Sequence, residues 1–162
     1  MKNQIRPLLS ELSRARMTAP PGIWSNSPDL AGWLLEHGQE FIFSPHKDLK
    51  KTRVGHCYQD SQELALKNPH LTYCEGYVQL GFEIPVPHAW CVNGKCQVVD
   101  VSLRSIQTPE RFYFGVPINN DVVGRFKAHP GTNLSILFWN ESNWPLQNGT
   151  IPELYWRKAI SC

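Results

Sequence analysis

The stretch VPHAWCVNGKCQVVDVSL, residues 86–103, consists of two runs rich in valine and aromatic residues on either side of Asn93-Gly94. Residues of this kind favour strands, and an Asn-Gly pair between two such runs is a strong hairpin signal. The stretch therefore predicts a β-hairpin. It also predicts which polar side chains lie together, because successive residues of a strand point to opposite faces.

The type of turn decides whether His88 and Asp100 lie on one face of this hairpin. A two-residue turn gives the paired residues an odd sum of indices and puts the two side chains on opposite faces. A three-residue loop at 92–94, with its glycine left-handed, pairs Cys91 with Lys95 instead. The two side chains are then diagonal neighbours, with about 7–8 Å between their backbones. A site that uses both residues predicts this bulged turn, or a bulge further along.

Upstream of the hairpin, the hydrophobic period is that of helices. Helices are predicted at 1–17 with Ile5, Leu8, Leu9 and Leu12 on one face, from Ser27-Pro28-Asp29 to Gly38, at 44–50, and from about Cys57 to Lys67. Ser27-Pro28-Asp29 offers a hydroxyl cap and a proline in the first turn. Asn68-Pro69 ends the last of these helices, because a residue before proline avoids the helical region.

From Leu71 the period changes to that of strands. Strands are predicted at 71–80, 86–92, 95–103, 111–118 and 134–139, with a last helical turn at 153–160. Helices followed by an antiparallel sheet predict an α+β fold. A chain of 162 residues, 41% hydrophobic and 19% charged, is expected to be one globular domain. The central part of this domain is expected at about residues 50–120, preceded by N-terminal helices (1–50) and followed by a C-terminal extension (120–162).

Composition argues against several classes of partner. The formal net charge is only +2, and the one basic cluster, KDLKKTR at 47–53, is interpreted as a solvated helix end or loop, so no nucleic-acid partner is expected. No apolar run is long enough to span a membrane, and the N-terminus lacks a secretory signal. The five cysteines, an odd number, argue against a disulfide framework. We therefore expect a cytoplasmic protein without a membrane partner.

Cys57 opens a predicted helix in GHCYQD, residues 55–60. A thiol attacks as thiolate, and the pKa of a thiol is lowered by a helix N-terminus and by a neighbouring imidazolium. Gly55 permits a tight entry into the helix and a close approach by a substrate. The local sequence thus supplies one of the two devices expected of a nucleophilic cysteine.

The second device requires a histidine from elsewhere, and His88 is the candidate. Pro87 beside it removes a backbone donor and predicts an edge or a break in the ladder, which leaves room for a substrate. Asp100 would orient the imidazole by accepting a hydrogen bond from its other nitrogen. The alternatives are a strand histidine that binds a backbone carbonyl, and an aspartate that pairs with Arg104 or another cation.

Four further residues are candidates for substrate binding: Tyr58, Glu75, Tyr77 and Trp90. Tyr58 either lines the mouth of the site or belongs to the core. Glu75 and Tyr77 share a face of their strand, and a structural ion pair is an equally good interpretation. Trp90 is expected to pack under the site on the His88 face. His56 is interpreted as a surface or capping residue.

A zinc site is an alternative use of the cysteines and histidines of this region. The possible ligands are His56, Cys57, Cys74, His88, Cys91 and Cys96. No CxxC or HxxxH pair occurs, and CVNGKC alone is a weak signal, so neither a metal nor another cofactor is expected. Cys74, Cys91 and Cys96 are interpreted as small packing residues.

The order of these motifs resembles the transglutaminase-like branch of the papain-type cysteine-enzyme superfamily. The matching pieces are GHCYQDSQELAL (55–66), YCEGYV (73–78) and HAWCVNGKCQVVDVS (88–102), and YFGVPI (113–118) is similar to small stand-alone bacterial and phage members. The resemblance covers roughly residues 50–120. It implies Cys57 as nucleophile, His88 as base and Asp100 as orienting acid, with the cysteine on a helix packed against an antiparallel sheet.

The resemblance also implies a thiol-dependent hydrolase or acyl transferase that acts on an amide, isopeptide or ester bond of a peptide, a protein or a small amide. Some members have lost the triad, so the alternative is a non-catalytic protein that binds a peptide or a small ligand on the same scaffold. The chain departs from the pattern in the short spacing between His88 and Asp100 and in the Val-Ser that follows the aspartate. The oxyanion-hole donor is either Gln39 or the backbone N–H of Cys57.

Overall fold

The computed structural model describes residues 5–18, 29–43, 55–81, 84–103, 110–127 and 135–137. These residues form a mixed α and β fold. The elements in chain order are α1 (Ile5–Thr18), α2 (Leu30–His37), β1 (Gln39–Phe43), α3 (Cys57–Lys67), β2 (Thr72–Leu80), β3 (Val86–Val92), β4 (Gln97–Val99), β5 (Arg111–Ile118) and α4 (Asn120–Lys127). The helix predicted at 44–50 and the helical turn at 153–160 lie outside the described residues.

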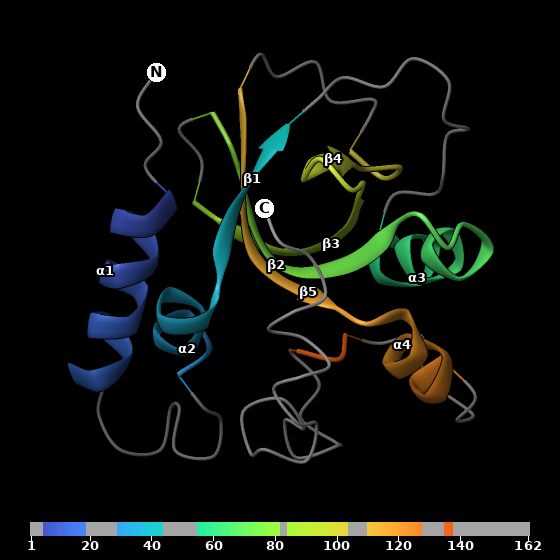
Figure 1. Ribbon diagram of the computed structural model, residues 1–162. Coiled ribbons are helices and arrows are strands. Elements are labelled where there is room, and N and C mark those ends of the chain that lie inside the picture. Colours follow the sequence, from blue (N-terminus) through green and yellow to red (C-terminus); the bar gives the residue numbers. More distant parts are fainter. Residues whose placement is uncertain are drawn as a thin grey trace.

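The five strands close into a barrel in the order β1-β4-β3-β2-β5. β1 pairs in parallel with β4, and all other neighbouring strands are antiparallel. Helices α1 and α2 lie side by side on one side of the barrel, and α3 and α4 lie on the other (Figure 1). The predicted antiparallel pairing is confirmed for β2 to β5, whereas the sequence pattern did not predict β1, its parallel pairing or the closure.

Alternation along the strands divides the buried apolar side chains into two clusters. Inside the barrel lie Phe41, Cys74, Val78, Trp90, Val92, Cys96, Val98 and Tyr113. Between the barrel and the helices lie, among others, Leu9, Leu34, Ala65, Tyr73, Ala89, Cys91, Phe114, Val116 and Val123. The position of a residue along its strand therefore decides whether its side chain faces the barrel interior or the helices.

Two glycines allow β2 and β5 to approach closely and leave room for Trp90 inside the barrel. Gly76 and Gly115 are paired across these strands. A Cβ atom at Gly76 would overlap the carbonyl oxygen of Phe114, and one at Gly115 would overlap both the neighbouring backbone and the indole of Trp90. The fully buried Trp90 therefore occupies space that Gly115 leaves free, and Gly76 allows the close approach of the β5 backbone.

Helix boundaries follow local chemistry closely. Helix α3 begins at Cys57 and ends at Lys67, as predicted. At its end, the backbone N–H of Asn68 donates a hydrogen bond to the carbonyl oxygen of Ala65. The cap of α2 is Asp29, whose carboxylate accepts a hydrogen bond from the backbone N–H of Gly32, and not the predicted Ser27.

Within α1, Ile5 and Leu9 are buried and Leu12 is 38% exposed. One smaller prediction is wrong. Residues 135–137, predicted within a strand at 134–139, are not in a strand. The hydroxyl of Ser135 and the backbone N–H groups of Ile136 and Leu137 donate to the carboxylate of Glu75 instead, as described below.

The turn of the β3–β4 hairpin has a three-residue loop, but two residues later than predicted. Cys91 pairs with Val99 and Val92 with Val98, so the even sum of indices is confirmed, while the pairing of Cys91 with Lys95 is wrong. Cys96, at φ 56°, takes the left-handed position predicted for Gly94. The side chain of Asn93 accepts hydrogen bonds from the backbone N–H groups of Lys95 and Gln97, which fixes Asn93 at the start of the turn.

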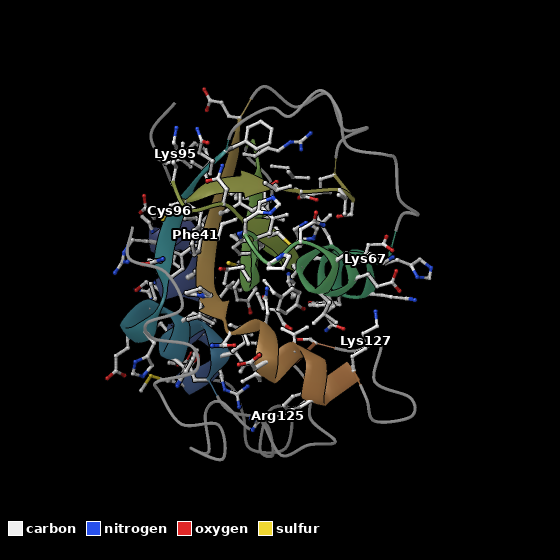
Figure 2. All side chains as sticks on the ribbon, turned by 45° about the vertical axis from the view of Figure 1, so that its right-hand side comes forward. Phe41, Lys67, Lys95, Cys96, Arg125 and Lys127 are labelled. Carbon is white, nitrogen blue, oxygen red and sulfur yellow. The ribbon has the colours of Figure 1, made fainter. Side chains whose placement is uncertain are left out.

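Cys96 is disulfide-bonded, which corrects its interpretation as a small packing residue. It lies beside Lys95 at the turn of the hairpin (Figure 2). Cys57, Cys74 and Cys91 are free thiols. Cys74 and Cys91 are fully buried, as expected of packing residues, and only Cys57 among the three is partly exposed.

Helices α3 and α4 are joined on the surface by an ion-pair cluster. Glu63 of α3 lies 3.6 Å from Lys67 on its own helix and 3.1 Å from Lys127 of α4. The two lysines project on the same side of the molecule (Figure 2). Among the described helices, none has the length and apolar character needed to cross a membrane.

Candidate active site

The candidate residues meet at one end of the barrel. His88 lies near the start of β3, and Asp100 directly follows β4, so the antiparallel hairpin brings them to the same end. The ladder between the two strands stops at Cys91 and Val99, and at Pro87 the strand β3 is paired only with β2. The break predicted at Pro87 is therefore present on the β4 side of β3.

His88 and Asp100 form a buried, hydrogen-bonded pair. The His88 Nε2 atom lies 2.8 Å from the Asp100 Oδ2 atom, and the two residues are 4% and 5% exposed. Both face the barrel interior, as the even register requires. The alternative in which Asp100 pairs with Arg104 falls on a residue outside the described part of the chain.

The carboxylate of Asp100 accepts hydrogen bonds on both oxygens. Oδ1 accepts from the backbone N–H and the hydroxyl of Ser102, at 2.9 and 3.0 Å, and from the backbone N–H of Leu103 at 3.1 Å. Oδ2 accepts from the phenol of Tyr113 at 2.8 Å, beside His88. A carboxylate held by five donors has little freedom to rotate, and it is stabilised as an anion.

Cys57 approaches the same histidine from helix α3. The helix packs on the outer face of β3, where the Ser61 hydroxyl donates to the carbonyl oxygen of Ala89 at 3.1 Å. The first residue of the helix lies near His88, since the side chain of Cys57 is among the groups that raise the pKa of His88. Because Nε2 is engaged by Asp100, Nδ1 is the ring nitrogen that remains for the sulfur.

The ionisation of the pair follows from these contacts. Burial alone would lower the pKa of His88, but the hydrogen bonds to Asp100 and Cys57 and the charges of both residues outweigh it and raise the pKa from 6.5 to about 9. Burial would raise the pKa of Asp100, yet the hydrogen bond and charge of His88 lower it from 3.8 to about 2. At neutral pH the pair is thus an imidazolium and a carboxylate.

This pair predicts a particular dependence of stability on pH. The pKa of His88 is raised on folding, so its contribution is complete below pH 6.5 and is lost as pH rises to about 9. The pKa of Asp100 is lowered on folding, so its contribution is complete above pH 3.8 and is lost as pH falls to about 2. Urea unfolding should therefore show the free-energy advantage of the wild type over His88→Gln falling by roughly 2–3 kcal/mol between pH 6 and pH 9. An advantage that is constant over this range would contradict the assignment.

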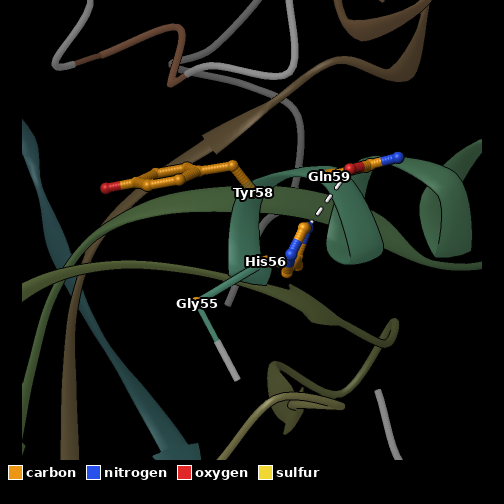
Figure 3. Close-up of a pocket in the computed structure, with 4 residues that line it drawn as sticks. All are labelled: Gly55, His56, Tyr58 and Gln59. Atoms are coloured by element: carbon orange, nitrogen blue, oxygen red, sulfur yellow. Dashed lines mark hydrogen bonds between the residues drawn. The ribbon is translucent and has the colours of Figure 1, made fainter. Parts of the chain in front are cut away.

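A cavity of about 220 Å³ opens beside the start of α3, lined by Gly55, His56, Tyr58 and Gln59. Gly55 has φ 86°, the left-handed conformation that glycine permits. Figure 3 shows Tyr58 extending over the strands, while the His56 Nδ1 atom lies 3.4 Å from the Gln59 side-chain oxygen. His56 occupies the cap position without a side-chain cap, so it leaves the first-turn backbone N–H groups available to a ligand.

Glu75 and Tyr77, predicted as substrate-binding residues, lie on the other face of the sheet. The β2 residue that pairs with His88 is Gly76, so its two neighbours point toward the helices. The carboxylate of Glu75 is fully buried and accepts hydrogen bonds from the Tyr73 phenol at 2.6 Å and from residues 135–137. Glu75 therefore holds residues 135–137 against β2 by hydrogen bonds, whereas the alternative drawn from the sequence was a structural ion pair.

Tyr58 combines the two roles that the sequence left open, because it lines the cavity and packs against the outer cluster. Burial, followed by the charge of Glu75, raises its pKa. Trp90 packs under His88, as expected, with the two rings nearly parallel and their centroids 6.3 Å apart. Since Trp90 is fully buried, it supports the site from below. Gln39 lies in β1, paired with Gly115.

Sequence reasoning missed Tyr113 and Ser102, the two side-chain hydroxyls that bind Asp100. Ser102 carried a signal, since it follows Asp100 by two residues, a spacing at which an aspartate binds its own backbone. Tyr113 carried none beyond its place in YFGVPI, because its strand follows β4 in sequence but is not paired with it in the barrel. Only closure of the barrel brings the two residues together.

Among the described residues, no three histidine, cysteine, aspartate or glutamate side chains are grouped in a way that could hold a metal ion. Comparison of the chain with models of known protein families gave no match, and neither curated protein sequences nor solved structures gave one.

Proposed function

We propose that the chain is a thiol-dependent hydrolase or acyl transferase that acts on an amide, isopeptide or ester bond, with Cys57 as nucleophile, His88 as acid and base, and Asp100 as the residue that orients His88. One observation carries the proposal: His88 binds Asp100 through one ring nitrogen, at 2.8 Å, and the neighbouring side chain of Cys57 contributes to raising the pKa of His88. Sulfur, imidazole and carboxylate in this order are the parts that nucleophilic catalysis by a thiol requires.

The reaction would proceed in two halves. The thiolate of Cys57 attacks the carbonyl carbon to give a tetrahedral oxyanion, which collapses as His88 gives its proton to the departing amine or alcohol and leaves a thioester. Water or an amine then loses a proton to His88 and attacks the thioester. The second oxyanion collapses with cleavage of the C–S bond. The acid or the new amide is released, and Cys57 leaves as a thiolate beside the protonated His88.

The start of α3 supplies the other requirements. The backbone N–H of Cys57 is the proposed oxyanion donor, since Cys57 is the first residue of α3 and the cap residue His56 makes no side-chain hydrogen bond to this helix. The cavity beside Cys57 is lined by an imidazole, a phenol and an amide. Such a lining favours an acyl group that carries polar hydrogen-bonding atoms near the scissile carbonyl.

The arrangement of the elements supports the resemblance to the transglutaminase-like branch. A helix that begins with the cysteine packs on strands β2 and β3, and the following hairpin carries the histidine and the aspartate. The barrel interior places Trp90 beneath the histidine. We propose on these grounds that the barrel is a version of the papain-type core, with peptides, proteins or small amides as substrates.

The proposal is tested by the rate at which iodoacetamide alkylates Cys57. Selective labelling alone would not decide it, because Cys74 and Cys91 are protected by complete burial. The informative comparison is between the wild type and His88→Ala, in which the thiol stays exposed but loses the imidazolium. We expect alkylation at pH 7 to slow about tenfold, since an ordinary thiol is only a few per cent thiolate at this pH. Peptide mass spectrometry of timed samples measures it.

Replacement of His70, which is exposed on the surface, by alanine is the matched control and should leave the rate unchanged. Equal rates in the wild type and His88→Ala would contradict the proposal. They would favour the non-catalytic binding protein instead, for which Cys57→Ser should also leave the biological activity intact.

A further inference from the structure

Tyr113 reaches Asp100 from across the barrel. It belongs to β5, whereas Asp100 follows β4, and β5 is bonded to β1 and β2 only. Its phenol lies 2.8 Å from Asp100 Oδ2, the same oxygen that His88 Nε2 approaches at 2.8 Å. Tyr113 therefore restrains Asp100 Oδ2, the oxygen that orients the imidazole, independently of His88.

The ring of Tyr113 is itself fixed by its neighbours. It packs edge-on against Trp90 with centroids 5.2 Å apart, stacks on Phe43 at 6.1 Å and lies 6.4 Å from His88. Only 1% of the residue is exposed. A buried phenol with a locked ring places its hydroxyl with little freedom, which is what a supporting residue of a catalytic group needs.

The direction of the hydrogen bond is also set. Burial and the charge of Asp100 raise the pKa of Tyr113 well above its ordinary value, although the nearby Arg111 acts in the opposite direction. The phenol therefore stays protonated and donates to the carboxylate. Besides Tyr113, Cys57 acts on the pair through His88, and Arg111 acts on Tyr113. The charge of Asp100 also acts on Cys91, whose side chain lies on the outer face.

We propose that Tyr113 is a positioning residue, which holds Asp100 Oδ2 in place so that the imidazole of His88 stays turned with Nδ1 toward the sulfur of Cys57. The contribution of Tyr113 to catalysis rests on the proposed function. Its physical content, the coupling of Tyr113 to the ionisation and orientation of His88, does not depend on which substrate is cleaved.

The test compares Tyr113→Phe with Tyr73→Phe. Tyr73 is a matched control, because it is also fully buried and also donates to a buried carboxylate, that of Glu75, on the other face of the sheet. The pKa of His88 is read from NMR titration of histidine-labelled protein, with the resonance assigned from His88→Gln. Tyr113→Phe should lower the pKa of His88 by about one unit and slow alkylation of Cys57 at pH 7 by about threefold or more, while Tyr73→Phe changes neither.

An unchanged or raised pKa of His88 in Tyr113→Phe would overturn the inference, and so would equal decreases in both variants, which would reflect general loosening of the barrel. If Tyr113→Phe does not fold, Tyr113→Met also removes the hydroxyl and allows the same measurement. Failure of the proposed function is recognised separately, because it appears as equal alkylation of Cys57 in the wild type and His88→Ala, whatever the pKa of His88 does in Tyr113→Phe.

Discussion

Replacing His88 by alanine is expected to slow formation of an acyl-enzyme by about 100- to 10,000-fold, the usual contribution of a positioned acid and base. The assay is the initial burst of p-nitrophenol from p-nitrophenyl acetate, which should approach one equivalent per chain in the wild type, as Cys57 is acylated. In the proposed mechanism His88 pairs with the thiolate and gives a proton to the leaving group. The other described histidines are not placed to replace it, since His37 ends α2, His56 binds Gln59 and His70 is exposed.

Three variants make the burst experiment specific. Cys57→Ser should remove the burst, because a serine hydroxyl beside a protonated histidine has no base to activate it. Cys91→Ala, which removes a buried thiol on the outer face, should retain it, and so should His70→Ala. A burst that survives in Cys57→Ser would show that another group is acylated, and the assignment of the nucleophile would then be wrong.

The second large effect is expected in stability, on replacement of Glu75 by alanine. Its carboxylate accepts hydrogen bonds from the phenol of Tyr73, the hydroxyl of Ser135 and the backbone N–H groups of Ile136 and Leu137. Removing it leaves four buried donors without their acceptor, two of which are backbone groups that cannot turn away. We expect a loss of about 3–5 kcal/mol in the free energy of unfolding, measured by urea denaturation.

Local effects should accompany this loss. Amide exchange at Ile136 and Leu137 should accelerate, because the carboxylate is the acceptor for both N–H groups. Glu63→Ala is the matched control, since Glu63 also accepts contacts from two residues, Lys67 and Lys127, but does so on the surface, where such pairs contribute about 0–1 kcal/mol. Similar losses in the free energy of unfolding of the two variants would contradict this prediction, because the buried carboxylate would then stabilise the fold no more than an exposed one.

Local chemistry made much of the fold predictable. The start of α3 at Cys57, its end before Asn68-Pro69 and the strands at 72–80, 86–92 and 111–118 depend on glycine, proline and β-branched residues within a few positions. Strand β1 escaped prediction because only Phe41 of its five residues is buried, and its partners lie far along the chain. Its stability comes from barrel closure, which no local pattern encodes.

The turn of the hairpin shows where two local signals compete. Asn-Gly predicts a glycine in the left-handed position, yet Asn93 accepts two backbone hydrogen bonds and becomes the first residue of the turn. The left-handed residue is then Cys96, a residue type that seldom adopts this conformation. The register nevertheless has the even sum that the site required, because both versions of the loop contain three residues.

The sequence predicted that His88 and Asp100 share a face, but it did not predict the residues that bind Asp100 from elsewhere in the fold. His88 and Asp100 could be brought to one face by counting along two adjacent strands, since register alone decides it. Tyr113 could not, because its contact with Asp100 crosses the barrel interior. The role of Glu75 could not be predicted for a related reason. Its carboxylate oxygens accept hydrogen bonds from residues 135–137, which are distant in sequence and come near Glu75 only in the folded chain.

The paired glycines of β2 and β5 bear on how this protein could diverge during evolution. A side chain at either glycine would push the two strands apart, and one at Gly115 would also take the space of Trp90, whose ring lies nearly parallel to that of His88. Variants that keep this barrel are therefore expected to keep both glycines, whereas exposed positions can change freely.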